Sequence, residues 1–301
     1  MDQTERLRAL CPGAVIRTGV PLDKYTTLRL GGPADYFCEP ESADELCLLL
    51  SAAEEMKMPV LLMGNGSNLL IRDGGFRGLV LRMGKGLSRI ERTDGGLRAG
   101  AGALLSTLAR AAQEHHLTGL EFAQGIPGSV GGGLYMNAGA YGGELGKVVS
   151  SVRVLDNGKE RTLNPDEMGF AYRHTRAMEE NWVILEADFR LEEGNPGEIA
   201  AAMQDFASRR REKQPLEYPS AGSFFKRPPG HFAGALIEQS GLKGYAVGGA
   251  QVSEKHAGFL INRGGATAAD FLRLMEHVQD TVEKRFGVRL EPEVRIVGSE
   301  K

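Results

Sequence analysis

Eight glycines and no charged side chain lie among the nineteen residues from Gly125 to Gly143. Average usage of about 7% would place one or two glycines in such a stretch. Because glycine loses more backbone entropy on folding than any other residue, this density indicates a backbone that bends where side chains cannot fit. Bare amide groups in such a segment can approach an anion, most often a diphosphate. We therefore expect a buried loop that wraps a ligand, since an ordinary surface loop of this length would carry charged side chains.

A second glycine-bearing turn, Gly64–Asn68 (GNGSN), lies upstream between two apolar runs. Taken alone it could be an ordinary turn between strands, because Asn and Gly both tolerate positive φ. Two such segments in one chain favour a dinucleotide ligand, and a bound dinucleotide suggests redox chemistry. Neither segment is a Walker sequence, and neither has the strand–turn–helix context of a Rossmann fingerprint.

Four further features could carry chemistry. The basic group formed by Arg209–Arg211 and Lys213 is expected at the end of a helix, where it either complements the helix dipole or clamps a phosphorylated substrate. Glu293 lies in an apolar strand, where a carboxylate is costly unless it is paired. Taken alone, Ser223 is most simply a turn serine, and Arg173 a surface or ion-pair residue.

Length and composition limit the possible partners. The 301 residues can form two or three domains, and 36 Lys+Arg against 39 Asp+Glu give a net charge of −3. We therefore expect neither nucleic acid nor a membrane as a partner. Three cysteines without a C-x-x-C pair and six histidines without ligand spacing predict no disulfide framework and no metal site. With no signal peptide and no membrane span in the sequence, we expect a cytoplasmic protein that is a monomer or a weak oligomer.

The first eighty-odd residues are predicted to form a small α/β unit. Ser42 and Glu45 have the spacing of a capping box, which opens a helix with an apolar stripe at Leu46, Leu49, Leu50 and Ala53. Apolar runs predict strands over 59–63, 69–71 and 79–81.

From about Gly84 the pattern predicts a mostly antiparallel α+β section. Hairpins are expected around the turns 93–96 and 156–158, a helix over 103–115, and an alternating strand over 183–191.

The last third begins with a helix capped by Asn195 and ending in Arg209–Arg211. The proline-containing segment 214–222 is predicted to link two domains. Beyond it we expect a helix from about 232, a strand over 258–262, a long helix between Thr267 and Gly287, and a final strand over 294–297.

Six ordered motifs resemble those of the UDP-N-acetylenolpyruvoylglucosamine reductases, flavoproteins of bacterial peptidoglycan precursor synthesis. The resemblance runs from about Thr26 to Gly298 and is closest to the shorter second type of the family. In chain order the motifs are 27–34 (TLRLGGPA), 64–70 (GNGSNLL), 125–128 with 136–140 (GIPG and MNAGA), 172–173 (YR), 221–226 (AGSFFK) and 291–295 (EPEVR).

The resemblance implies an α+β fold with a vanillyl-alcohol-oxidase-like (PCMH-type) FAD-binding domain. Two α/β subdomains, at residues 1–84 and 85–208, would hold FAD without a covalent bond. An α+β substrate-binding domain would follow at 209–301, its last strand returning to the flavin site. The implied cofactor-binding residues are Gly64, Asn65, Gly66, Ser67, Asn68, Gly125, Ile126, Pro127, Gly128, Ser129, Gly132, Asn137, Ala138 and Gly139.

The family reaction passes a hydride from NADPH to FAD and then to the enolpyruvyl ether of UDP-N-acetylglucosamine enolpyruvate, and a proton follows to give UDP-N-acetylmuramate. By position, Ser223 matches the proton donor, while Arg173 and Glu293 match the residues that stabilise the enolic carboxylate. Lys213 matches a lysine on the substrate diphosphate. Tyr172 and Arg227 are also expected to bind substrate, although some relatives have asparagine at the second position.

Two departures from the family pattern are mild: Thr175 stands for a serine and Gly133 for an alanine. Two other functions stay open at this point. One is a sugar- or lactone-oxidising FAD oxidoreductase on the same scaffold, and the other is a nucleotide-binding module without catalysis.

Overall fold

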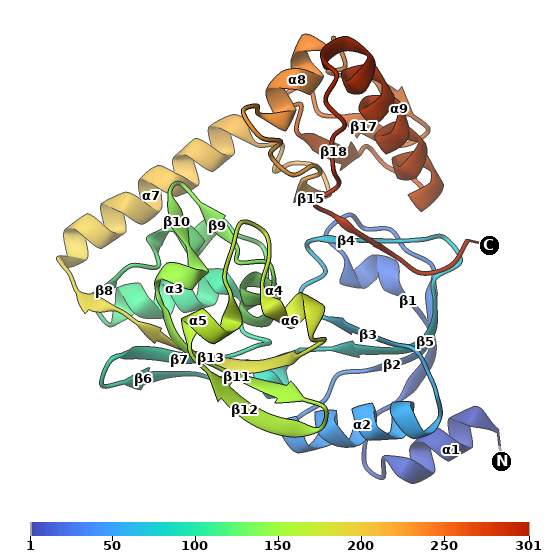
Figure 1. Ribbon diagram of the computed structural model, residues 1–301, viewed down its shortest axis with the longest axis vertical. Coiled ribbons are helices and arrows are strands. Elements are labelled where there is room, and N and C mark those ends of the chain that lie inside the picture. Colours follow the sequence, from blue (N-terminus) through green and yellow to red (C-terminus); the bar gives the residue numbers. More distant parts are fainter. Residues whose placement is uncertain (1, 301) are drawn as a thin grey trace. The chain divides into compact units, whose positions relative to one another are not determined.

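The computed structural model describes residues 2–300 and divides into two compact units (Figure 1). Unit 1 contains the residues up to 18, 36–65 and 78–209, and unit 2 contains 19–35, 66–77 and the residues from 210 on. Four boundaries fall inside β1 (Arg17–Pro21), β2 (Pro33–Cys38), β5 (Phe76–Arg82) and α7 (Pro196–Lys213), and a fifth falls between Asn65 and Gly66. The division at 84 and 208 into two FAD-binding subdomains and a substrate domain stays a prediction.

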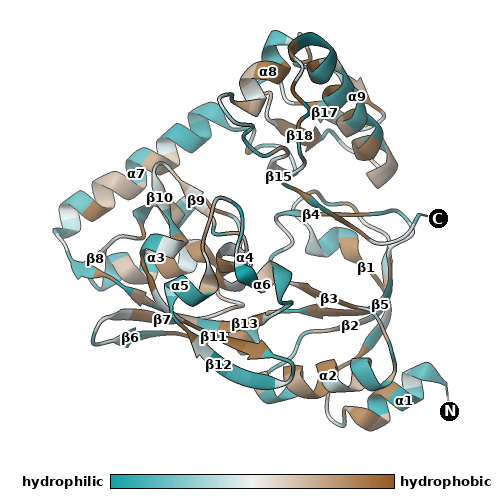
Figure 2. Ribbon diagram, in the orientation of Figure 1, coloured by the Kyte–Doolittle hydropathy of each residue, from teal (hydrophilic) through white to brown (hydrophobic). Residues whose placement is uncertain are grey.

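The centre of unit 1 is a five-stranded antiparallel sheet with the order β12-β11-β13-β7-β6. Its strands are β6 (Ile90–Thr93), β7 (Gly96–Gly100), β11 (Val149–Asp156), β12 (Lys159–Leu163) and β13 (Val183–Arg190). Both predicted hairpins and the alternating strand are therefore confirmed. The edge strand β12 is exposed over its first four residues and hydrophilic (Figure 2), which discourages pairing with another chain.

Two helices, α3 (Leu105–Glu114) and α4 (Val130–Tyr135), pack against this sheet (Figure 1). The second one corrects a prediction, because α4 lies inside the segment that we expected to be a loop. Ser129 caps it by accepting a hydrogen bond from the Gly132 N–H at 3.3 Å. Its glycines also permit close packing: a Cβ atom on Gly131 would lie 2.8 Å from the Cβ of Ala101.

The predicted helix and strand of the α/β part are present as α2 (Ala43–Glu55) and β3 (Val60–Met63). Ser42 caps α2 by accepting from the Glu45 N–H at 3.1 Å. The predicted capping box is wrong in its second half, because the Glu45 carboxylate accepts from the Glu41 N–H at 2.7 Å and not from the Ser42 N–H. A four-stranded sheet has the order β1-β2-β5-β3, in which β3 and β5 run parallel. One hydrophobic core, from Leu7 to Met203, fills unit 1.

Several shorter elements, none of them predicted, complete unit 1. They are α1 (Gln3–Leu10), η2 (Lys85–Leu87), β8 (Leu117–Thr118), η3 (Glu121–Gly125), β9 (Gly139–Ala140), β10 (Gly143–Glu144), η4 (Leu145–Lys147), α5 (Pro165–Met168), α6 (Arg176–Glu179) and β14 (Glu192–Glu193).

Unit 2 has its own core and an antiparallel sheet with the order β15-β18-β17-β16. Its elements are η1 (Leu22–Tyr25), β4 (Leu69–Ile71), β15 (Ser220–Ser223), α8 (Ala233–Gln239), β16 (Ala246–Val247), β17 (Ala250–Val252), β18 (Phe259–Asn262), α9 (Ala268–Phe286) and β19 (Arg295–Val297). The predicted capping box of Thr267 and Asp270 and the Gly287 terminus of α9 are confirmed. The final strand β19 pairs in parallel with β4.

The predicted linker at 214–222 is wrong at its end, because β15 begins at Ser220 and pairs with β18. The backbone hydrogen bonds that this strand makes to Ile261 and Phe259 overrode the local turn preference of Pro, Ser and Gly. Residues 2–300 contain no helix with the length and hydrophobicity that a bilayer crossing requires.

Candidate functional site

Gly64 and Asn65, the part of the first glycine-bearing segment that belongs to unit 1, lie beside the second segment. The Asn65 side chain donates a hydrogen bond from Nδ2 to the Pro127 carbonyl at 2.6 Å. Gly64 faces Ser129 so closely that a Cβ atom would lie 2.0 Å from the serine Oγ. Only glycine fits at position 64, and the missing side chain lets the backbone of Gly64 come close to Ser129. The sequence predicted each segment separately, and the structure brings them together.

Several backbone amides in these segments are available to a ligand. The backbone N–H groups of 65–67 find no hydrogen-bond acceptor among residues 2–300. The same holds for the N–H groups of Gly128 and Ser129. A folded protein pairs nearly all buried amides, so such groups need water or a ligand as an acceptor. Consecutive N–H groups of this kind form a nest for an anion. Each of the two segments therefore fits an anionic group such as a phosphate of a dinucleotide.

The other predicted cofactor residues hold the backbone of the second segment in place. Gly125 ends η3, and the Ile126 N–H donates to Ala123 O at 3.0 Å. The Ala138 N–H donates to Gly133 O at 2.7 Å, and Gly139 begins β9.

Asn68 has a structural task in unit 2. Its Nδ2 donates to Glu293 O at 3.0 Å, and its carbonyl accepts from the Arg295 N–H at 3.0 Å. These bonds join the start of β4 to the segment that leads into β19. Asn68 thus sets the position of the Glu293 backbone.

Arg173 lies at the tip of a tight turn in unit 1. The turn is closed by hydrogen bonds in both directions between Ala171 and His174, at 3.0 and 3.3 Å. Arg173 has a φ of 54°, which is a left-handed conformation, and its guanidinium carbon lies 5.2 Å from the centre of the Tyr172 ring. Tyr172 is 55% exposed and Arg173 is half-buried, so the tip of the turn is open to solvent at Tyr172.

Two buried side chains fix this turn. Asn137 donates from Nδ2 to Ala171 O at 3.0 Å, and the Thr175 hydroxyl donates to Tyr135 O at 2.9 Å. The sequence associated Asn137 with the cofactor and treated Thr175 as a mild departure from the family. The sequence signal for Thr175, which lies two residues after Arg173, was weak, because its burial depends on residues far away in the chain, such as its partner Tyr135.

Ser223 and Glu293 lie on neighbouring segments of unit 2. The residues after β15 pair with 291–293 through an antiparallel bridge between Phe225 and Pro292. The Glu293 N–H donates to Phe224 O at 2.9 Å, and Lys226 N–H donates to Glu291 O at 2.8 Å. Proline is tolerated at position 292 because the hydrogen bonds around the bridge are donated by Glu293 and Lys226, so no N–H is needed from Pro292. Ser223, the predicted proton donor, therefore directly precedes Phe224, whose carbonyl accepts the hydrogen bond from the Glu293 N–H.

The predicted substrate-binding cations are exposed in unit 2. Lys213 is the last residue of α7, where a cation complements the helix dipole. Arg227 stacks its guanidinium carbon 3.9 Å from the centre of the Phe232 ring, and its Nε donates to His231 O at 3.4 Å.

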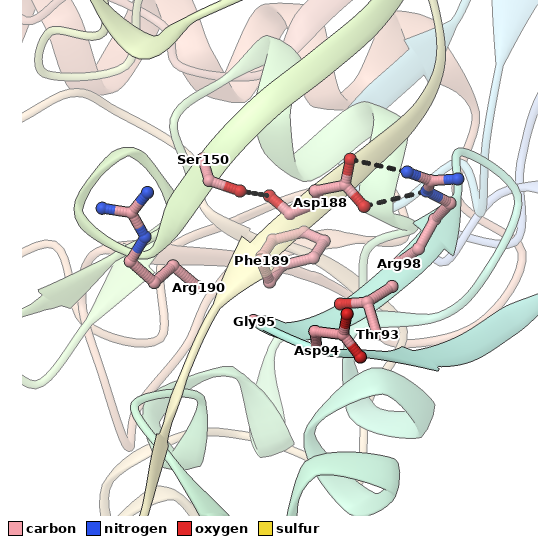
Figure 3. A pocket seen from close by; sticks show the side chains of 8 residues that line it. All are labelled: Thr93, Asp94, Gly95, Arg98, Ser150, Asp188, Phe189 and Arg190. Carbon is pink, nitrogen blue, oxygen red and sulfur yellow. Dashed lines mark hydrogen bonds and ion pairs between the residues drawn. The ribbon is translucent and has the colours of Figure 1, made fainter.

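A cavity of about 350 Å³ lies elsewhere in unit 1, at the hairpin of β6 and β7 (Figure 3). Arg98 and Asp188 form a bidentate pair in its wall, with distances of 2.8 and 3.0 Å. The hydrogen bonds from Arg98 keep the pKa of the Asp188 carboxyl below its ordinary value. None of the predicted site residues lines this cavity.

Cysteine chemistry finds no support in unit 1. Cys38 is fully buried, and burial raises the pKa of its thiol to about 11. Burial also raises the pKa of the Cys11 and Cys47 thiols. The three thiols are therefore poor nucleophiles at neutral pH.

Two family models match the chain in separate regions. An FAD binding domain matches residues 34–164, and the C-terminal domain of UDP-N-acetylenolpyruvoylglucosamine reductase matches residues 214–297. The chain is 52% identical to the UDP-N-acetylenolpyruvoylglucosamine reductase of Agathobacter rectalis, over 92% of each chain. It is 47% identical to that of Caldanaerobacter subterraneus subsp. tengcongensis, over 98% of this chain and 97% of the relative.

Solved structures agree on the fold. The UDP-N-acetylenolpyruvylglucosamine reductase of Thermus caldophilus has a TM-score of 0.82 and 35% identity, covering 95% of this chain and 99% of that one. The BBE-like 1 protein of Physcomitrella patens has a TM-score of 0.50 and 17% identity, covering 64% of this chain and 45% of that one, and is similar in fold alone. The predicted α+β fold with a vanillyl-alcohol-oxidase-like, FAD-binding domain is confirmed.

Proposed function

Because the chain belongs to the UDP-N-acetylenolpyruvoylglucosamine reductase family, we propose that it reduces UDP-N-acetylglucosamine enolpyruvate to UDP-N-acetylmuramate with electrons from NADPH. The protein is an FAD-dependent oxidoreductase of peptidoglycan synthesis. The observation that carries the proposal is that one chain matches both an FAD-binding domain and the reductase C-terminal domain. A sugar or lactone oxidase on the same scaffold would lack the second match.

FAD, when bound, supplies hydride transfer from NADPH to the vinyl carbon of the enolpyruvyl ether. The unpaired amides of 65–67 and of Gly128 and Ser129 support the proposal that these segments bind its diphosphate. The remaining cofactor residues are proposed to keep the backbone of both segments in this shape.

The proton that follows the hydride is proposed to come from the Ser223 hydroxyl. An aliphatic hydroxyl is a weak acid, but the acceptor carbon of an enolic intermediate is strongly basic. Support comes from the exposure of Ser223 at the end of β15 and from its place beside the Glu293 segment.

Arg173 and Glu293 are proposed to stabilise the negative charge that develops on the substrate carboxylate. A guanidinium can bind both carboxylate oxygens in a fork, and a protonated carboxyl can donate one further hydrogen bond. Lys213, Tyr172 and Arg227 are proposed to bind the UDP-sugar, in keeping with their exposed side chains. The cytoplasmic location stays a prediction.

The test separates the two halves of the reaction. In Ser223→Ala, the reduction of FAD by NADPH should stay within about twofold of the parent rate. Reduction of the enolpyruvyl sugar should slow by about 10²–10⁴-fold, the usual contribution of proton transfer. Stopped-flow absorbance of FAD measures both rates. The matched control is Ser220→Ala in the same strand, whose backbone carbonyl still accepts from the Thr27 hydroxyl at 2.6 Å.

Two outcomes would contradict the proposal. Equal slowing of both halves in Ser223→Ala would remove its role as a proton donor. Oxygen consumption with an alcohol or lactone, with no turnover of NADPH in the presence of the enolpyruvyl sugar, would indicate an oxidase instead.

A further inference from the structure

Two buried side chains attach the turn of Arg173 to one short segment at the end of α4. Before the turn, Ala171 O accepts from Asn137 Nδ2 at 3.0 Å. After the turn, the Thr175 hydroxyl donates to Tyr135 O at 2.9 Å. The attachment points, Tyr135 and Asn137, are two residues apart in the sequence. All of these residues belong to unit 1.

The segment that receives these bonds is itself held tightly. The Asn137 N–H donates to Leu134 O at 3.0 Å, and its Oδ1 accepts from the Gly146 N–H at 2.9 Å. Asn137 is only 2% exposed and Thr175 has no exposed surface. Neither side chain can therefore reach a substrate, and both act on the surrounding backbone.

Arg173 needs such support for two reasons. Its φ of 54° is unfavourable for a residue with a side chain, so its surroundings must hold the turn in this conformation. A guanidinium also binds a carboxylate well only when its planar fork is aimed correctly, so a small rotation of the turn would weaken both hydrogen bonds.

We propose that Asn137 and Thr175 are positioning residues that set the direction of the Arg173 guanidinium toward the substrate carboxylate. This inference rests on the role of Arg173 in the proposed function. It also gives α4 a second task, because the glycine-rich segment proposed to bind FAD and the turn of Arg173 share this helix. The short helix α4 then positions both the segment proposed to bind FAD and the turn whose Arg173 is proposed to bind the substrate carboxylate.

The test is a double-mutant cycle on the full-length enzyme loaded with FAD. Thr175→Val removes the hydroxyl and nearly keeps the volume. It should slow reduction of the enolpyruvyl sugar about tenfold, as expected for one lost hydrogen bond. Reduction of FAD by NADPH should stay within about twofold, and Thr175→Ser should restore the parent rate. In the Arg173→Ala background, Thr175→Val should cost less than about twofold more.

A second variant examines the other attachment. Asn137→Asp keeps the acceptor for the Gly146 N–H and removes the donor to Ala171 O, so it should show the same selective loss. The control is Thr118→Val, which removes a threonine hydroxyl bond to Glu121 at 2.7 Å in the same unit. This control should lower thermal stability without changing the ratio of the two half-reaction rates.

The outcomes separate this inference from the proposed function. If Arg173→Ala slows enolpyruvyl reduction to a low but measurable rate while Thr175→Val multiplies its own loss onto that variant, the positioning role is overturned and the proposed function stands. Equal slowing of both half-reactions in Thr175→Val and Asn137→Asp would likewise overturn it. An Arg173→Ala enzyme with unchanged turnover would overturn the assigned role of Arg173 and this inference with it.

Discussion

At the scale of single residues, Arg173 and Asn137 are two of the residues with a side chain that adopt a left-handed conformation. Their φ values are 54° and 41°. A residue with a Cβ atom pays about 1–2 kcal/mol for this conformation, although asparagine pays less because its side chain can bond locally. Such residues persist where the surrounding hydrogen bonds require them, and they cluster at functional sites. For Arg173 the requirement comes from the Ala171–His174 turn.

Asp270 gives a prediction at the same scale. Burial opposes its ionisation, but hydrogen bonds from Thr267, Arg273 and the Gly249 N–H outweigh burial, so its pKa lies below the ordinary value. Because the folded pKa is the lower one, the carboxylate stabilises the fold above the unfolded pKa of about 4, and this contribution is lost as the pH falls through the folded pKa.

Asp270→Asn should therefore lower the free energy of unfolding by about 1–3 kcal/mol at pH 7, since it leaves an unsatisfied donor at the start of α9. The difference from the parent should shrink at pH 3. Urea unfolding at both pH values measures it. Glu276→Gln, an exposed change on the same helix, is the control. A difference that stays constant between the two pH values would show that charge is not responsible.

At the scale of elements, α4 shows that glycines can serve helix packing as well as ligand approach. The Gly131 N–H donates to Ala101 O at 2.9 Å, and this draws α4 against the strand–helix connection that contains Ala101. A methyl group on Gly131 would meet the Cβ of Ala101 at 2.8 Å, which is fixed to its backbone. A methyl group on Gly133 would meet only the ends of the Leu105 and Leu145 side chains, each at 2.9 Å.

These neighbours predict different changes in stability for two alanine variants of α4. Both substitutions gain about 1 kcal/mol of helix propensity. Gly133→Ala should be close to neutral, because two flexible leucine side chains can shift. Gly131→Ala should lose about 2 kcal/mol relative to it through overpacking. The midpoints of thermal unfolding check this, and equal midpoints would show that the glycines are not selected by packing.

The same helix marks how far the sequence could predict the fold. The strands β3, β4, β5, β13, β18 and β19, both hairpins and the capped helix α9 followed from local periodicity and turn residues, because those signals lie within each segment. The helix α4 could not be predicted, because glycine has a poor helix propensity and the contact with Ala101 is distant in sequence. The strand at Ser220 was hidden in the same way, since its partners Ile261 and Phe259 lie about forty residues further on.

The candidate site shows the same limit. Ser223, Arg173 and Glu293 were chosen by resemblance to a family, since each type of residue is common in turns, surfaces and strands. The attachment of Asn137 and Thr175 to the Arg173 turn required the structure, because it joins residues 34 and 40 positions apart.

At the scale of the whole molecule, the two glycine segments differ from the long helix α9 in how their amides are paired. The amides of 65–67, Gly128 and Ser129 donate to no acceptor among residues 2–300, whereas those of the long helix α9 take part in helical hydrogen bonds. Unpaired amides exchange with solvent hydrogen readily, and a bound anion would pair them. Bound FAD should therefore slow hydrogen exchange directly only at the amides of these two segments, while it raises the stability of the whole folded chain.

Hydrogen exchange across the whole chain, with and without FAD, tests this expectation. Adding FAD at about 100 times its Kd should stabilise the folded state by about 2.7 kcal/mol through mass action. Beyond that general gain, peptides covering 64–68 and 125–139 should become protected early in the exchange, while peptides of α9 should change only at the longest times. The α9 peptides are the internal control, since Thr267 and Gly287 already cap both ends of that helix. An early gain spread evenly over α9 and both glycine segments would show that FAD is not held by these amides.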